Sequence, residues 1–175
     1  MVDREEKRAQ FEEPRHRGGF ARIIVLAVGV LLAAGAGFWA FLGENGGSGK
    51  YPAVSARAGE VALPLEEISD GQAHFFSYRH QGETIDFFVL KSHDGVIRTA
   101  FDACDVCYQD RKGYRQEGDA MVCINCGQRF PSDLINEVRG GCNPAPLKPS
   151  IRDGQLVIAE AALLEGAWYF QQEKI

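Results

Sequence analysis

The motifs of several common enzyme classes are missing from this chain of 175 residues. It has no P-loop, no glycine pattern of a dinucleotide-binding fold and no internal repeat. It also lacks a Ser-His-Asp set, a pair of carboxylates at catalytic spacing and a phosphate-binding loop, so neither a hydrolase nor a kinase is indicated. The sequence therefore favours a non-enzymatic protein.

Basic charge is also scarce. The chain has 19 Lys and Arg against 24 Asp and Glu, a formal net charge of -5. Residues 43–175 hold thirteen of the basic and nineteen of the acidic side chains, and no basic stripe runs through them. Because nucleic-acid binding relies on clustered Lys and Arg, we expect no nucleic-acid partner.

A long apolar run stands near the start of the chain. Residues 23–42 read IIVLAVGVLLAAGAGFWAFL, without a charge or an amide. At about 1.5 Å per residue this length spans the roughly 30 Å hydrocarbon core of a bilayer. Basic residues precede the run and interfacial aromatics end it, namely Arg15, Arg17, Arg22, Phe38, Trp39 and Phe41. The pattern predicts one transmembrane helix.

The positive-inside rule gives this helix an orientation. It leaves residues 1–22 as a cytoplasmic tail and places the rest of the chain on the periplasmic side of a bacterial inner membrane, as a single-pass protein. A cleaved signal peptide is the alternative, because the AAGAG stretch offers small residues near a cleavage point. The apolar run is longer than the apolar core of a signal peptide, which usually has 7 to 15 residues, and this favours an uncleaved anchor.

The remainder divides into a linker and a β domain. Residues 43–54 begin with GENGGSGK and predict a flexible linker, and residues 55–172 form the predicted domain. Short β-rich runs occur at 61–65, 74–79, 84–91, 96–101, 150–152 and 155–160. The predicted hairpin turns are Asp70–Gly71, Gln81–Gly82, Asp94–Gly95 and Asp153–Gly154.

The fold class follows from these runs. We expect a mainly β protein, with a small antiparallel β domain preceded by one transmembrane α-helix. Residues 161–170 predict a short closing helix, in which Trp168, Tyr169 and Phe170 pack in the core rather than form a cofactor platform.

Five cysteines carry the most specific signal. Cys104 and Cys107 in CDVC, and Cys123 and Cys126 in CINC, give the spacing C-x2-C-x15-C-x2-C. Each C-x2-C turn points two thiolates at one ion or cluster, so this spacing predicts a four-sulfur metal site. The spacing does not choose the metal. Zinc, copper and an iron-sulfur cluster all remain open.

Other potential ligands fit less well. Asp102, Asp105 and Asp119 lie near the cysteines, but carboxylates are poor ligands where four soft sulfurs are available, and we interpret them as solvated loop charges. Histidines 16, 74, 80 and 93 are distant from the cysteine pairs and have no ligand spacing.

Two interpretations without a metal are possible. Two disulfides would suit an oxidising compartment, but five cysteines leave one thiol over. A thiol-disulfide redox protein would need an exposed thiolate of low pKa, which a sequence does not reveal.

The order of the motifs resembles the Rieske iron-sulfur domain. In that domain two loops each bring a Cys and a His to a [2Fe-2S] cluster, and a third loop with proline covers it. Here VIRTAF is followed by the first cysteine pair, then by the second pair, and later by NPAPL. Cysteine fills both histidine positions, which adds negative charge and should lower the reduction potential.

A closer resemblance is to the FtrD-like membrane iron-sulfur proteins of bacteria. It rests on CDVCY, on GY at 113–114, on CINCGQRFP and on GGCNPAPL, and it covers roughly residues 55–170. The family implies an inner-membrane iron-sulfur protein that handles electrons beside a permease or redox partner of a ferrous-iron uptake system. It also implies that Cys142 joins the four paired cysteines as a metal-site position.

The loop around Cys142 predicts that this fifth thiol lies near the other four. Gly140 and Gly141 permit a close backbone approach, and Pro144 and Pro146 stiffen the segment that follows. We expect Cys142 to act as an exchangeable ligand or as a partner of one cysteine of the first pair. A small buried side chain in a turn is the alternative.

Overall fold

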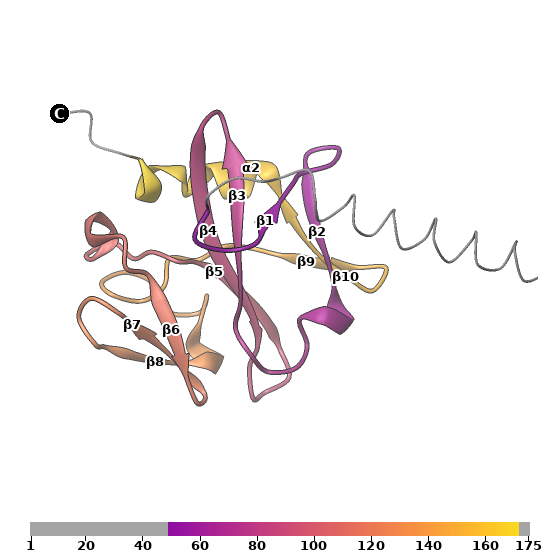
Figure 1. The fold of residues 1–175 in the computed structure, drawn as a ribbon. Coiled ribbons are helices and arrows are strands. Elements are labelled where there is room, and N and C mark those ends of the chain that lie inside the picture. Colours follow the sequence, from indigo (N-terminus) through magenta and orange to yellow (C-terminus); the bar gives the residue numbers. More distant parts are fainter. Residues whose placement is uncertain (1–48, 172–175) are drawn as a thin grey trace, which may run out of the picture. The chain divides into compact units, whose positions relative to one another are not determined.

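A hairpin of two long strands forms the centre of the fold in the computed structural model, which describes residues 49–171. Strand β3 (His74–His80) turns at Gln81–Gly82 into β4 (Glu83–Lys91). Both turn residues have positive φ, 49° and 87°, as a two-residue type I′ turn requires. β5 (Ile97–Phe101) pairs with β4, and β1 (Ala53–Val54) runs parallel to β3, which gives the order β1-β3-β4-β5 (Figure 1).

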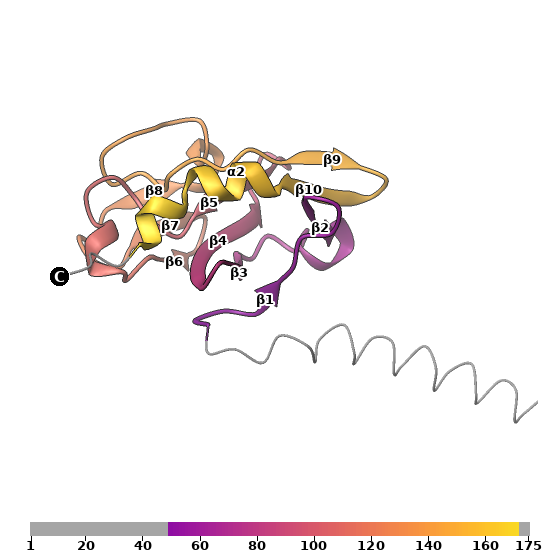
Figure 2. The ribbon, with the colours of Figure 1, turned by 90° about the horizontal axis from the view of Figure 1, so that it is seen from above.

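A second sheet joins the two ends of the domain. Its strands are β2 (Glu60–Pro64), β10 (Gln155–Ala159) and β9 (Ser150–Arg152), in the order β2-β10-β9. The predicted turn at Asp153–Gly154 connects β9 to β10, again with two positive φ angles. The short helix α2 (Glu160–Glu165) follows β10, and Figure 2 shows it on the same side of the central hairpin as this sheet.

A third sheet carries part of the cysteine region. It contains β6 (Tyr114–Glu117), β7 (Ala120–Cys123) and β8 (Arg129–Pro131), in that order, and it lies beside the lower half of the central sheet in Figure 1. No local pattern in the sequence predicts these three short strands. The described chain also has 3-10 turns at Leu65–Glu67, Tyr108–Asp110, Ser132–Leu134 and Ala167–Phe170.

β4 is buried on both faces, which explains its nearly continuous apolar run. Its side chains alternate, so Phe87 and Val89 enter a core with β2 and β10, whereas Phe88 and Leu90 enter a second core with β6 and β7. All four are at most 1% exposed. The second core also holds Cys104 and Cys123, so the cysteine loops are anchored to a packed part of the domain.

The mainly antiparallel sheets confirm the predicted β domain, but several details differ. Asp70–Gly71 makes no hairpin, because it connects strands of different sheets, β2 and β3. The predicted helix at 161–170 ends as an α-helix at Glu165 and continues as a 3-10 turn. At this break Gly166 lies so close to Phe101 that a Cβ would be 2.2 Å from the ring. Tyr169 is buried as expected, whereas Trp168 is 46% exposed.

The N-terminal boundary of the β domain also differs from the prediction. We predicted a linker over residues 43–54, but β1 lies within that range and pairs with β3. The predicted tail and transmembrane helix, residues 1–22 and 23–42, lie outside the described residues. Between residues 49 and 171, no helix is both long enough and apolar enough to cross a membrane.

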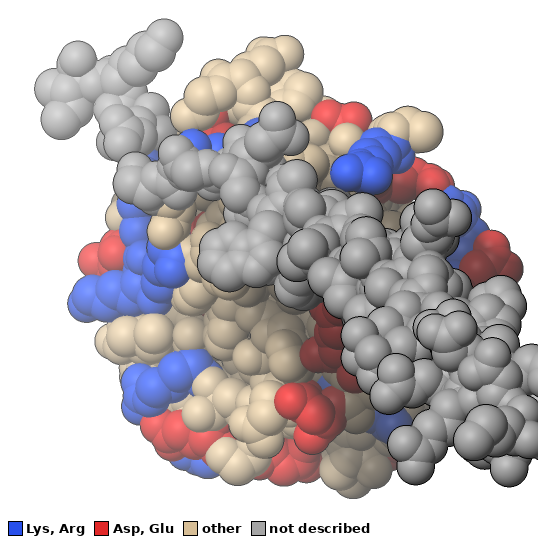
Figure 3. Space-filling model, turned by 45° about the vertical axis from the view of Figure 1, so that its right-hand side comes forward, with Lys and Arg blue, Asp and Glu red and all other residues tan. Residues whose placement is uncertain are grey.

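The charged side chains of the domain are mixed. On the face seen in Figure 3, basic and acidic residues alternate with uncharged ones, and the visible part of the described domain shows no broad area of one sign. This distribution agrees with the absence of a basic stripe in the sequence.

Candidate metal centre

The first cysteine loop starts directly after β5. Cys104 is 1% exposed, and Cys107, at the start of a 3-10 turn, is half-buried. The backbone N–H of Cys107 donates to Cys104 Sγ at 3.2 Å. Such a turn brings both sulfurs to one side of the loop, as the C-x2-C spacing predicts.

The second loop is the turn between β7 and β8. Cys123 is the last residue of β7 and is buried, whereas Cys126 is exposed. The turn is closed by two backbone hydrogen bonds, from Gly127 N–H to the Cys123 carbonyl and from Cys123 N–H to the Gln128 carbonyl, both 2.9 Å. Gly127 has φ of 75°, a conformation that favours glycine.

Backbone contacts with β5 fix the third loop, which carries Cys142. The N–H of Phe101 donates to the carbonyl of Ala145 at 2.8 Å, and Ala145 N–H donates to the Ala103 carbonyl at 2.9 Å. In addition, the Tyr114 hydroxyl donates to the Cys142 carbonyl at 2.7 Å. The third loop is therefore held against the start of the first cysteine loop.

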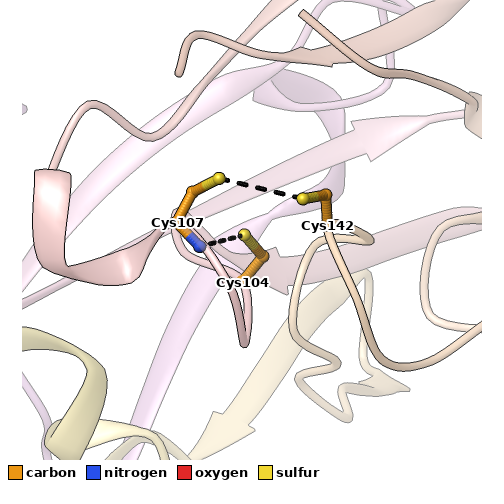
Figure 4. A group of neighbouring side chains, drawn as sticks. All are labelled: Cys104, Cys107 and Cys142. Atoms are coloured by element: carbon orange, nitrogen blue, oxygen red, sulfur yellow. Dashed lines mark hydrogen bonds between the residues drawn. The ribbon is translucent and has the colours of Figure 1, made fainter. Parts of the chain in front are cut away.

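The three loops bring all five sulfur atoms together in two overlapping groups. The Sγ atoms of Cys104, Cys107 and Cys142 lie within 4.8 Å of one another, and so do those of Cys107, Cys123 and Cys126. Cys107 belongs to both groups. Its Sγ is 3.8 Å from that of Cys142, and Figure 4 shows these two sulfurs facing each other across the gap between their loops.

The surroundings of three thiols shift their pKa values in different directions. Burial raises the pKa of Cys123 to about 11, and burial together with hydrogen bonds to Cys126 and Cys107 also raises the pKa of Cys142. The backbone N–H of Gln128 lowers the pKa of Cys126. This hydrogen bond favours the thiolate of the exposed Cys126, and a thiolate is the form that binds a metal.

The donor set fits an iron-sulfur cluster. Thiolate sulfur is the ordinary ligand of such clusters, and four of the five thiols come from two C-x2-C loops. Three of the four histidines lie in the described chain, and each has a carboxylate neighbour instead: His74 with Asp70, His80 with Glu160 and His93 with Asp119. His16 lies outside the described residues.

Of the three aspartates near the loops, only Asp102 differs from our expectation of solvated charges, because Asp105 and Asp119 are exposed. Asp102 is only 5% exposed and accepts hydrogen bonds from Lys50, Tyr51 and the Tyr114 N–H. Burial nevertheless raises its pKa. Asp105 is exposed but accepts a hydrogen bond from the Tyr169 hydroxyl at 2.5 Å, and Asp119 contacts Ser132 and His93.

Tyr114 and Lys50 are site residues that sequence reasoning did not identify individually. Tyr114 is 2% exposed, and burial together with the nearby Cys104 sulfur raises the pKa of its hydroxyl. The GY motif contains Tyr114 but does not reveal its contacts. No local pattern relates Lys50 to Asp102, because 52 positions separate them.

Comparison with protein families gives a match over most of the domain. Residues 68–170 match the family model described as membrane iron-sulfur containing protein FtrD-like. The match covers more than half of the chain and includes all five cysteines. No curated protein is significantly similar in sequence to this chain.

Solved structures with some likeness are crystal structures of the quaternary ammonium Rieske monooxygenase CntA. The form with the inhibitor MMV12 is 15% identical, with a TM-score of 0.38, and the likeness covers 55% of this chain and 29% of that one. The form with gamma-butyrobetaine is 15% identical, with a TM-score of 0.37 and coverages of 55% and 30%. The chain thus spans about a third of the length of these enzymes.

Proposed function

Because the chain belongs to the family of FtrD-like membrane iron-sulfur containing proteins, we propose that its cysteine centre holds a [2Fe-2S] cluster that transfers electrons. We further propose that the domain works on the periplasmic side of a bacterial inner membrane, beside a permease or redox partner of an iron-uptake system. The arrangement of the sulfurs carries the proposal, since two C-x2-C loops meet at Cys107.

Cys104, Cys107, Cys123 and Cys126 would hold the cluster, with Cys142 beside them. When bound, such a cluster accepts and releases one electron at a time. Four thiolates place more negative charge on it than the two Cys and two His of a Rieske centre, so we expect a lower reduction potential.

The surrounding residues divide the centre into a protected and an open side. Cys104 and Cys123 pack in the core with Phe88, Met121 and Ile135, which excludes water from that side. Cys126 is exposed, and its neighbour Ile124 is 39% exposed. An electron-transfer partner would therefore approach the centre from the side of the second loop.

The cluster is tested first by spectroscopy. We expect full-length protein purified without oxygen to be coloured, to contain iron and acid-labile sulfide in equal amounts, and to give a paramagnetic resonance signal after one-electron reduction. A colourless protein that contains zinc would support a structural zinc site instead. Bound copper without sulfide would support a copper-binding module.

Cysteine variants then test the ligands. Cys107→Ser and Cys123→Ser should each yield colourless, unstable protein, because metal bound to thiolates contributes on the order of 10 kcal/mol to folding in structural zinc sites. Val106→Ser and Ile124→Ser are matched controls in the same two loops, since both side chains are exposed. If either cysteine variant kept its full metal content and wild-type stability, the four-sulfur site would be wrong.

The role in iron uptake has a separate test. Cells that lack this chain should take up less ferrous iron at low external iron, and the wild-type chain should restore uptake, whereas Cys107→Ser should not. Restoration by Cys107→Ser would argue against an electron-transfer role in transport.

A further inference from the structure

An ion pair joins the start of the described domain, at Lys50, to Asp102 beside the first cysteine loop. The Lys50 ammonium donates to Asp102 Oδ2 at 2.9 Å and to the Lys112 carbonyl at 3.0 Å. The hydroxyl of Tyr51 donates to the same Asp102 oxygen, also at 2.9 Å. Two consecutive residues at the N-terminal end of the domain thus bind one carboxylate.

Asp102 connects this N-terminal segment to both cysteine loops. It lies two residues before Cys104, and its Oδ1 accepts the Tyr114 N–H at 2.7 Å. Gly113 packs directly on the carboxylate, where a Cβ would be 2.1 Å from Oδ2. The carbonyl of Gly113 in turn accepts the N–H of Ile124, inside the second loop, at 2.9 Å.

The same contact shares a cavity with three of the cysteines. A cavity of about 180 Å³ is lined by Lys50 and Asp102 and also by Cys104, Cys107 and Cys123. The Asp102 side chain is 2% exposed, whereas that of Lys50 is 40% exposed. The carboxylate therefore depends on protein donors, since a buried charge without a partner is strongly destabilising.

We propose that Lys50 and Asp102 form a positioning ion pair, which fixes the cysteine loops to the N-terminal segment and sets the reduction potential of the centre. Lys50 lines the same cavity as three of the cysteines, so its positive charge would stabilise the reduced, more negative form of a bound cluster. The carboxylate has the opposite effect. Lys50 is thus a redox-tuning residue at the point where the chain enters the domain.

The influence on the potential rests on the proposed iron-sulfur function, but the structural role of the ion pair does not. We therefore propose two measurements on the full chain in detergent. The first is the reduction potential of protein with its cluster, and the second is the thermal unfolding of protein loaded with zinc alone. The variants are Lys50→Gln, Asp102→Asn, the double variant and Lys50→Arg.

Opposite shifts in potential are the expected signature. Lys50→Gln should make the potential more negative, by about 59 mV if the equilibrium between oxidised and reduced forms changes tenfold. Asp102→Asn should make it more positive, and the double variant should lie between the two. Lys50→Arg keeps the charge and should stay close to wild type. Lys91→Gln, at the far end of β4, is the control and should leave the reduction potential unchanged.

Thermal unfolding tests the ion pair itself. Each single substitution should lower the midpoint of the zinc-loaded protein, and the double variant should lose less than the sum of the two, because a shared contact is removed only once. If Asp102→Asn fails to fold, Lys50→Gln against Lys50→Arg still decides whether the positive charge matters.

Two results would overturn the inference. Shifts of both single variants in the same direction, or no shift in either, would exclude a tuning role for Lys50. Additive losses of thermal stability would show that Lys50 and Asp102 do not act as a pair. A chain that binds no cluster would instead refute the proposed function, and the zinc-loaded protein would still decide the positioning role.

Discussion

At the scale of single residues, Cys107 and Cys142 are the most informative pair. Cys107 is the sulfur shared by both groups of three, and Cys142 approaches it from a loop 35 positions further along the chain. The backbone bonds of Ala145 with Phe101 and Ala103 hold this loop in place. Cys142 is therefore well placed to cover Cys107 and to exchange with it.

Substitution of Cys142 tests this role. We expect Cys142→Ser to keep its iron but to release it to a chelator several-fold faster than wild type, because the sulfur beside Cys107 is lost. The rate of iron release is measured from the decay of visible absorption. Complete loss of iron would make Cys142 an obligatory ligand, and unchanged release and spectrum would leave it a packing role only.

Tyr114 gives a second residue-scale prediction. Tyr114→Phe removes the hydrogen bond to the Cys142 carbonyl, and we expect it to destabilise the zinc-loaded protein by about 1 kcal/mol. Chemical denaturation measures this loss of unfolding free energy. Tyr108→Phe is the control, since the described residues give the Tyr108 hydroxyl no hydrogen bond. Equal stability of Tyr114→Phe and wild type would mean that the third loop is held by its backbone bonds alone.

At the scale of elements, strand β4 organises the domain and the segment after β5 organises the site. β4 separates two cores, one of which contains Cys104 and Cys123. Cys123 is the last residue of β7 and Cys104 follows the end of β5 by three residues, whereas the more exposed cysteines lie in turns. Between the two loops, Gly113 allows the chain to pass over the Asp102 carboxylate.

Gly113→Ala should therefore be much more damaging than an ordinary glycine substitution. Gly113 has a φ of 70°, at which an alanine is strained, and the Cβ of the alanine would collide with Asp102. We expect a loss of about 2–4 kcal/mol in unfolding free energy and weaker metal retention. Gly118→Ala is the matched control, because Gly118 also has positive φ but has open space around it, so only about 1 kcal/mol of backbone strain is expected. Similar losses in both variants would show that the contact with Asp102 is unimportant.

At the scale of the whole molecule, the order of the parts suits an anchored electron carrier. The apolar run at 23–42 precedes the domain by only a few residues, and the domain starts with the Lys50 contact to the metal loops. Only a few residues therefore separate the predicted anchor from Lys50, which contacts Asp102 at the start of the first cysteine loop. The family match supports membrane association.

Topology can be measured directly. Alkaline phosphatase fused after Lys50 should be active, because residues 43 onward are predicted to be periplasmic, and the full-length protein should sediment with the membrane fraction. Reporter activity confined to the cytoplasm would overturn the predicted orientation. A mature chain lacking its first forty or so residues would favour a cleaved signal peptide.

Much of the site was predictable because its chemistry is local in sequence. The two C-x2-C turns specify soft sulfur ligands by their spacing alone, and the alternating runs specify the main hairpins. The strands β6 to β8 were not assigned, because they are short and partly polar, and their pairing depends on contacts with each other.

The sequence by itself determined the ligand type, the antiparallel β class and the family, because each rests on neighbouring residues or on ordered motifs. The sequence also predicted that Cys142 lies near the other four thiols, but only the tertiary structure decided that it faces Cys107, and that Asp102 is buried and bound by Lys50 rather than solvated. Such contacts join positions 35 and 52 residues apart. They form only when the packing of whole strands and loops offsets the entropy lost on closing those long segments of chain, and no local pattern encodes that balance.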